Sequence, residues 1–135
     1  MSKDVVECEL RVRYAETDQM GIAYYANYLI WFEVGRSEFC RQRDFSYAAL
    51  ENLGYKLVVT EVQCRYRNAA RYDELIIVRT KLKVLDKRII TFGYEILRKG
   101  KDELIAEGES RHLCVDAAGK PTSLPKEFLT RLAGH

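Results

Sequence analysis

Residues 24–43 read YYANYLIWFEVGRSEFCRQR, and this stretch decides the fold. Its apolar side chains recur at steps of three or four residues, which is the period of an α-helix. Further aromatic and aliphatic side chains lie on neighbouring faces, so this helix must be buried on more than one side. The sequence therefore predicts one long helix, over about 24–43, that the rest of the chain surrounds.

A strand pattern precedes this helix. Residues 7–14 alternate between apolar and charged side chains, which is typical of a half-buried strand. The predicted inner face carries Cys8, Leu10, Val12 and Tyr14. A polar loop over residues 15–21 then leads into the helix.

After the helix, a short second helix is expected over about 46–52, with Ser46 as its N-cap and Gly54 as its stop. Four strands then follow at 56–68, 74–86, 88–98 and 103–115, and a last helical turn is expected within 125–132. We expect the four strands in hairpin succession, with a turn at 99–102. The predicted class is α+β, with an antiparallel sheet of about five strands wrapped around the central helix.

Composition limits the classes of protein. The 135 residues suffice for one domain over 1–135, and 47% hydrophobic with 31% charged residues is typical of a soluble globular chain. A net charge of +2 gives no drive toward nucleic acid. The most apolar stretch, 21–32, is too short to span a bilayer, and the N-terminus lacks an apolar signal region. We therefore expect a cytoplasmic protein without membrane insertion.

The cysteines and histidines give no metal or disulfide pattern. The four cysteines form no CxxC pair, and His112 and His135 have no zinc-like spacing. We expect all cysteines to be reduced and His112 to be a structural strand residue. The cysteines are Cys8, Cys40, Cys64 and Cys114.

The residues that carry chemistry lie just before the long helix. Asp18 stands in the loop, and Gly21 after it permits a tight turn. The first amides of a helix have no partner within it and point outward as donors. A carboxylate facing such amides suits acyl transfer, since one amide can hold the developing oxyanion. The alternative is that Asp18 only caps the helix.

This region resembles the 4-hydroxybenzoyl-CoA thioesterase family of hotdog proteins, which includes the Tol–Pal-associated acyl-CoA thioesterase. The resemblance rests on Arg11-Val12-Arg13-Tyr14, Thr17-Asp18, Gly21 and Tyr24-Tyr25-Ala26-Asn27-Tyr28. Residues 66–74 also look like the family's turn between the second and third strands. The similarity spans about residues 7–130 and implies a hotdog fold.

The resemblance implies roles for the motif residues. Asp18 would be the catalytic carboxylate, either as nucleophile or as general base, and the Tyr25 amide would polarise the thioester carbonyl. Gly21 would shape the loop, and Asn27 would orient the substrate or cap a turn. Many members carry histidine where this chain has Tyr25, while others carry tyrosine. No metal or organic cofactor is implied.

The resemblance also implies an acyl-CoA substrate, whose three phosphates need cations. The candidates are Arg65, Arg67 and Arg71 near the second turn, and Lys87 and Arg88 at the third. For the acyl group, candidate pocket side chains are Tyr24, Trp31 and Phe32, which leave aromatic and aliphatic substrates open.

The function implied is hydrolysis of an acyl-CoA thioester to free CoA and a carboxylic acid. One alternative is a non-catalytic hotdog protein that binds acyl-CoA or a protein partner. A hotdog dehydratase ranks last, because it would need a catalytic histidine near the helix start. One sheet around one helix leaves a strand edge open, and open edges favour pairing. The resemblance implies that two chains associate edge to edge, so we expect at least a homodimer and, further, a homotetramer.

Overall fold

The computed structural model describes residues 4–134. The strands are β1 (Val5–Arg11), β2 (Lys56–Tyr66), β3 (Leu75–Leu85), β4 (Ile89–Arg98) and β5 (Glu103–Val115). The helices are α1 (Asn27–Gln42), α2 (Tyr47–Asn52) and α3 (Lys126–Leu132), and one 3₁₀ turn, η1 (Tyr14–Glu16), follows β1.

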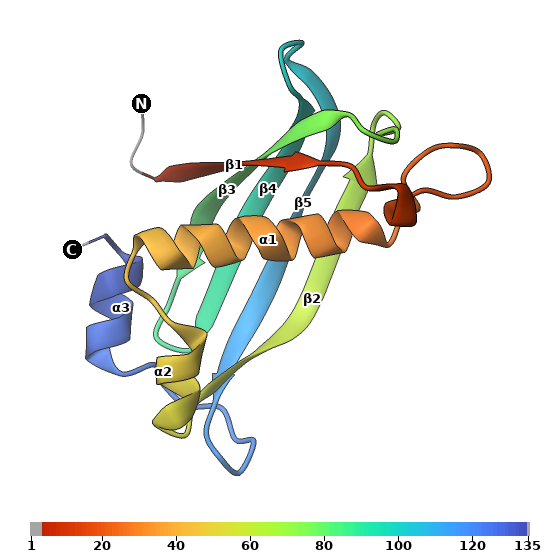
Figure 1. The fold of residues 1–135 in the computed structure, drawn as a ribbon. Helices are drawn as coiled ribbons and strands as arrows, with labels where there is room; N and C mark the ends of the chain where they lie inside the picture. Colours follow the sequence, from red (N-terminus) through yellow and green to blue (C-terminus); the bar gives the residue numbers. More distant parts are fainter. Residues whose placement is uncertain (1–3, 135) are drawn as a thin grey trace.

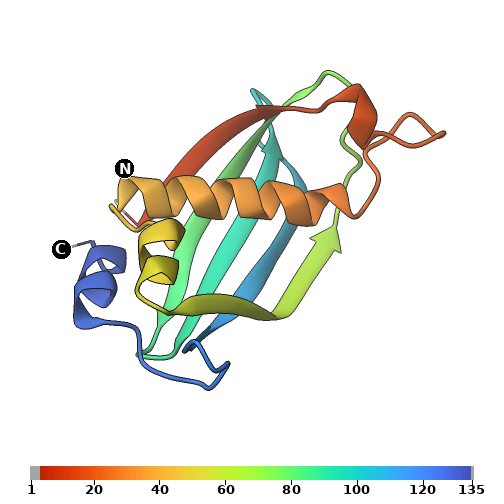
Figure 2. The same ribbon diagram turned by 60° about the horizontal axis from the view of Figure 1, so that its bottom comes forward.

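The five strands form one sheet in the order β1-β3-β4-β5-β2, and every neighbouring pair is antiparallel. The sheet curves around α1, which lies across its concave face (Figures 1 and 2). The α+β class and the five-stranded sheet wrapped on one long helix are therefore confirmed. The short helices α2 and α3 lie together near the C-terminal end of α1 (Figure 1).

The predicted hairpin succession is wrong at one place. β2 pairs with β5, at the edge of the sheet, and not with β3. Residues 67–74 form a connection that crosses from one side of the sheet to the other, so they are not the tight turn expected there. The reason is length, since hairpin loops usually have two to five residues and this connection has eight. The other two strand connections, β3 to β4 and β4 to β5, are hairpins.

Helix α1 begins three residues later than the apolar pattern predicts. Tyr24 to Ala26 form a turn in which the Asn27 amide donates to the Tyr24 carbonyl at 2.9 Å, and regular helix starts at Asn27. Gly35 lies in the middle of α1, where a Cβ would overlap Thr80 Oγ1 and come within 2.6 Å of Val78 Cγ1 on β3. The absence of a side chain thus lets the helix approach the sheet closely.

The core fills the space between α1 and the sheet. Phe32 stacks on Tyr94 of β4, with ring centroids 4.3 Å apart, and Phe39 contacts Phe92 edge-on. Trp31 and Phe32 are almost completely buried in this core, so their predicted place in an acyl pocket is wrong, whereas Tyr24 is exposed. The helical pattern marks Trp31 and Phe32 as apolar, but it does not show which side of the helix packs against the sheet.

Two local predictions near the ends of elements have different outcomes. Tyr14 does not face the core but is 76% exposed, because β1 ends at Arg11 and the chain turns into η1. The second helix is confirmed, since Ser46 Oγ accepts a hydrogen bond from the Ala49 amide at 3.1 Å. Gly54 has φ +92°, as its predicted role in stopping that helix requires.

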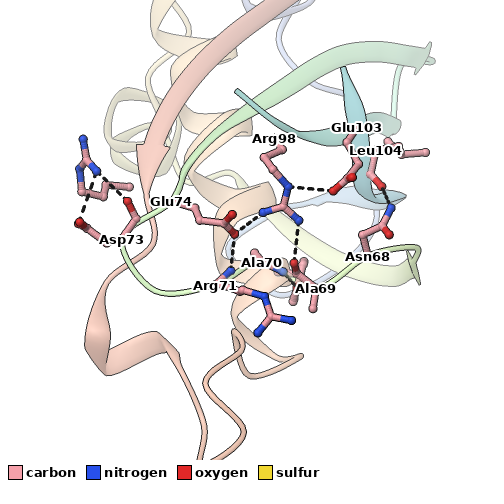
Figure 3. A network of polar contacts seen from close by, with 11 residues as sticks. Asn68, Ala69, Ala70, Arg71, Asp73, Glu74, Arg98, Glu103 and Leu104 are labelled. Carbon is pink, nitrogen blue, oxygen red and sulfur yellow. Dashed lines mark hydrogen bonds and ion pairs between the residues drawn. The ribbon is translucent and has the colours of Figure 1, made fainter. Parts of the chain in front are cut away.

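The crossing connection is held by Arg98 at the end of β4, as Figure 3 shows. The Arg98 guanidinium donates to the Ala69 carbonyl at 2.9 Å and forms ion pairs with Glu74 and Glu103. Asn68 Nδ2 donates to the Leu104 carbonyl at 2.7 Å. These bonds fix the connection in front of the N-terminal end of α1, where the Ala70 carbonyl accepts from the Ala23 amide at 2.8 Å.

The four cysteines are free, with Cys40 and Cys114 buried, as expected for reduced apolar residues. Among residues 4–134, no helix is long and apolar enough to cross a membrane.

Candidate active site

Asp18 lies in a loop that projects beyond the N-terminal end of α1 (Figure 1). A bridge between Thr17 and Ala23 closes the base of this loop, and the Asp18 amide donates to the Ile22 carbonyl at 2.9 Å. Gly21 has φ +79°, in the region that favours glycine, and its amide donates to the Asp18 carbonyl at 3.0 Å. The predicted role of Gly21 in shaping the loop thus agrees with its backbone conformation.

The Asp18 carboxylate is half-buried and has few hydrogen-bond partners. Within residues 4–134, the Met20 amide, 2.9 Å from Oδ1, is its only hydrogen-bond donor. The bond spans two residues and closes a small turn inside the loop, and it does not cap α1. The second oxygen, Oδ2, remains free to act on a substrate or a water molecule.

The start of α1 offers backbone donors. The amides of Tyr25 and Ala26 donate to no acceptor within the described part of the chain, whereas the next amide, that of Asn27, is already bonded to Tyr24. The positive end of the helix dipole adds to the pull of these two N–H groups on an anion. The Tyr25 side chain is 61% exposed and its backbone carbonyl accepts from Tyr66 Oη at 3.1 Å.

Glu16 joins the Asp18 loop to the helix, a role that the sequence patterns did not predict. This side chain is 5% exposed, and its carboxylate accepts from the Arg13 amide at 2.7 Å and from Trp31 Nε1 at 2.9 Å. Burial by itself would raise the pKa of Glu16, but these hydrogen bonds and the Arg13 guanidinium outweigh it and hold the pKa below its ordinary value. The only sequence signal was the spacing of Glu16 three residues after Arg13, as in a capping box.

Asn27 is tied to the same residue. Its side-chain amide donates to the Glu16 carbonyl at 2.8 Å, and the Tyr24 amide donates to the same oxygen at 2.8 Å. Of the two roles expected for Asn27, the structure thus shows a contact that holds the loop against the helix. Contact with substrate stays a prediction.

A shallow cavity of about 310 Å³ opens beside Tyr25, the first of the two residues with unpaired amides. Its lining is mostly apolar and includes Tyr25, Tyr28 and Tyr66. Tyr28 Oη accepts from the Ala70 amide at 3.2 Å, and the Tyr66 ring lies edge-on to Tyr28. Burial and a hydrogen bond with Cys64 raise the pKa of Tyr66 to about 12, so its phenol stays protonated at neutral pH. The spacing of residues gave no sign that the end of β2 would meet the helix start.

The predicted phosphate-binding residues do not come together in one chain. Arg71 lies at the site, where its backbone forms a bridge with Ile22, and Arg67 on the same connection pairs with Glu107 at 3.0 Å. Arg65 lies one step earlier, on β2, and is exposed. Lys87 and Arg88 lie between β3 and β4, near α3 and thus at the opposite end of α1 (Figure 1). Since α1 has 16 residues, its two ends are about 24 Å apart.

His112 lies outside this site. It is buried on β5, where its Nε2 lies 2.8 Å from Ser110 Oγ. Burial and the nearby Arg36 guanidinium lower the pKa of His112 to about 4, so the ring is neutral at physiological pH. Its predicted structural role agrees with this position. Among residues 4–134, no three histidine, cysteine, aspartate or glutamate residues gather as a metal site would require.

Comparisons with known proteins agree with this fold. The model of the Thioesterase-like superfamily matches residues 12–132. The acyl-CoA thioesterase YbgC of Haemophilus influenzae is 32% identical over 120 residues, covering 87% of each chain, and YneP of Bacillus subtilis is 38% identical over 121 residues, covering 89% of this chain and 87% of YneP. The solved DHNA-CoA thioesterase of Staphylococcus aureus superposes with a TM-score of 0.86 at 34% identity, covering 92% of this chain and 83% of that one.

The fold is thus that of a hotdog thioesterase. The chain belongs to the Thioesterase-like superfamily, and the resemblance found in its sequence is confirmed.

Proposed function

We propose that this chain, an acyl-CoA thioesterase by its family and relatives, uses Asp18 and the Tyr25 amide to cleave its substrate. The observation that carries the proposal is the pair of unpaired amides at the start of α1, next to the loop that holds a half-free carboxylate. In the net reaction the thioester C–S bond breaks and one water molecule is consumed, so that free CoA thiol and a carboxylic acid leave.

Each residue supplies one part of this reaction. Asp18 either attacks the carbonyl carbon, giving a mixed anhydride that water then opens, or removes a proton from the attacking water. The Tyr25 N–H donates to the thioester oxygen, which gains negative charge in the tetrahedral transition state. The tyrosine-lined cavity beside this amide provides an apolar wall for the part of the substrate next to the carbonyl.

We propose that the functional unit contains more than one chain. Within residues 4–134, β2 pairs only with β5, and it carries the exposed side chains of Val59 and Val62. Leu29 on α1 is also 40% exposed. Open strand edges with apolar side chains favour pairing with another chain. A homodimer through this edge, and a homotetramer built from it, would bring a second chain toward the Asp18 loop.

The substrate's phosphates need cations that one chain provides only in part. We propose that Arg65, Arg67 and Arg71 contact the CoA phosphates of the substrate. Arg67 and Arg71 lie beside the helix start, whereas Arg65 lines a separate hollow on the sheet with Arg79 and Lys83. We propose that Lys87 and Arg88, which lie between β3 and β4, contact the substrate bound to another copy of the chain. We place the assembled enzyme in the cytoplasm, without a nucleic-acid partner or membrane insertion.

The proposal is tested by thiol release from a panel of aromatic, short aliphatic and long aliphatic acyl-CoAs. We expect turnover with at least one group of substrates, and sedimentation at the mass of a dimer or larger. Tight binding of acyl-CoA without thiol release from any of them would instead identify a non-catalytic acyl-CoA binding protein.

A further inference from the structure

Glu16 is a buried carboxylate that contacts both sides of the site without lying in it. We propose that Glu16 is the positioning residue of the thioesterase site, which holds the Asp18 loop in register with the N-terminal amides of α1. This inference rests on the proposed function. It assigns to Glu16 no contact with substrate and no part in proton transfer.

The side chain of Glu16 connects three donors. Oε1 accepts from the Arg13 amide at 2.7 Å, which fixes the chain just before η1. Oε2 accepts from Trp31 Nε1 at 2.9 Å and from the Arg13 guanidinium at 3.3 Å. Trp31 is buried in the core and belongs to the second turn of α1, so this bond anchors η1 to a rigid part of the helix.

The backbone of Glu16 makes the second connection. Its carbonyl accepts from the Tyr24 amide and from Asn27 Nδ2, both at 2.8 Å. Two residues further on, the Asp18 amide donates to the Ile22 carbonyl. The two bonds form a short antiparallel ladder in which Glu16 lies opposite Tyr24, the residue directly before the unpaired Tyr25 amide. A shift of Glu16 would therefore move Asp18 relative to that amide.

Both oxygens of Glu16 act as acceptors, so glutamine cannot replace it without conflict. The side-chain amide introduced by Glu16→Gln would direct N–H groups either at the Arg13 amide or at Trp31 Nε1 and the Arg13 guanidinium. Because two donors then face each other, the side chain must move although its size is nearly unchanged. Glu16→Gln thus displaces the loop with little loss of packing.

The test separates kcat from KM for an acyl-CoA that the wild-type protein hydrolyses. A displacement of about 1 Å can lower a rate by about 100-fold, so we expect Glu16→Gln to lower kcat by about 10- to 100-fold. KM should stay within about twofold, since Glu16 does not meet the substrate. Glu51→Gln, an exposed change on α2, is the matched control and should leave both constants unchanged.

Trp31→Phe supplies a second, milder variant. It removes the Nε1 donor and keeps a ring against Tyr28, whose centroid lies 4.8 Å from that of Trp31. We expect a kcat loss of about three- to tenfold with KM unchanged. In the Trp31→Phe background, Glu16→Gln should cost less kcat than in the wild type, because the amide nitrogen no longer faces the indole N–H.

Amide hydrogen exchange gives a readout that needs no turnover. Faster exchange at the Asp18 and Tyr24 amides in Glu16→Gln, but not in Glu51→Gln, is expected if Glu16 holds the ladder. Folded Glu16→Gln with wild-type kcat overturns the proposal. If that variant does not fold, Trp31→Phe with wild-type kcat and wild-type exchange overturns it. Absence of thiol release in the wild-type protein itself would refute the proposed function, and the exchange rates would still decide whether Glu16 holds the loop.

Discussion

At the residue scale, the two proposed catalytic groups are of different kinds. In the proposed mechanism Asp18 acts through its side chain, whereas Tyr25 acts through its backbone N–H, and the Tyr25 phenol is exposed. An amide is common to all residues except proline. The proposed donor is therefore the same for tyrosine and for the histidine that the sequence resemblance implies in many members.

The Tyr25 amide is a group that proline removes. This amide donates to no acceptor among residues 4–134 and precedes regular helix by two residues, so its loss breaks no hydrogen bond of the fold. We expect Tyr25→Pro to lower kcat by about 10²- to 10³-fold, the range for losing one oxyanion donor. Tyr25→Phe keeps the N–H and should keep kcat within about threefold. Equal rates for the two variants, measured by thiol release, would show that the amide is not the donor.

His112 predicts how stability depends on pH. Its pKa is about 4 in the folded protein, below its ordinary value of 6.5, so between these values the unfolded chain binds more protons. Stability is therefore fully present above about pH 6.5 and falls as the pH drops toward 4, by about 2–3 kcal/mol. Urea denaturation from pH 4 to 7.5 should show a weaker dependence in His112→Gln. Parallel curves for variant and wild type would contradict the burial of a neutral ring.

At the element scale, α1 depends on close approach to β3. Gly35→Ala puts a methyl group against Thr80 and Val78, and overpacking of this kind costs about 1–3 kcal/mol. Glu33→Ala, an exposed change on the same helix, should leave the free energy of unfolding nearly unchanged. Denaturant titration of both variants measures the difference. A Gly35→Ala protein as stable as the wild type would mean that helix and sheet can separate there at no cost.

The elements themselves could be predicted from sequence, because each depends on local periodicity and local turn residues. The period of three to four residues located α1, and Ser46 and Gly54 located both ends of α2. Strand order could not be predicted in the same way, since alternation does not show which strand β2 will pair with. The predicted strands left only five residues between them, which suits a hairpin; the eight-residue connection is evident only in the structure.

The candidate site was predicted where its residues are close in sequence. Asp18, Gly21 and the helix start lie within one continuous motif, and the structure places Asp18 and Gly21 in the loop that leads into α1. Tyr66 reaches the site through pairing of β2 with β5, and Glu16 is bonded to Trp31, fifteen residues away. Such contacts follow from tertiary packing, which single-sequence patterns do not contain.

At the scale of the whole molecule, the two groups of basic residues lie at opposite ends. Arg71 is near the helix start, and Lys87 and Arg88 are near α3. We propose that one bound CoA uses both groups where two chains meet. The open edge of β2 is the surface that we propose for this contact.

The double variant Lys87→Ala and Arg88→Ala tests this arrangement. We expect a large rise in KM for acyl-CoA, because phosphate contacts are lost, and a much smaller rise for a short pantetheine thioester that lacks the nucleotide. Both substrates are compared in the same thiol-release measurement. Equal effects on the two would show that these residues do not meet the nucleotide.

Asp18→Asn is the most direct test of the proposed chemistry, because it removes the reacting carboxylate and keeps its size and its bond from the Met20 amide. We expect thiol release to fall by about 10²- to 10⁴-fold, the range for a lost acid–base group. Asp102→Asn is the control, since that exposed turn residue has φ +50°, a conformation that asparagine adopts readily. It should keep wild-type turnover and folding. Turnover by Asp18→Asn at the wild-type rate would contradict the assignment of Asp18 as the catalytic carboxylate.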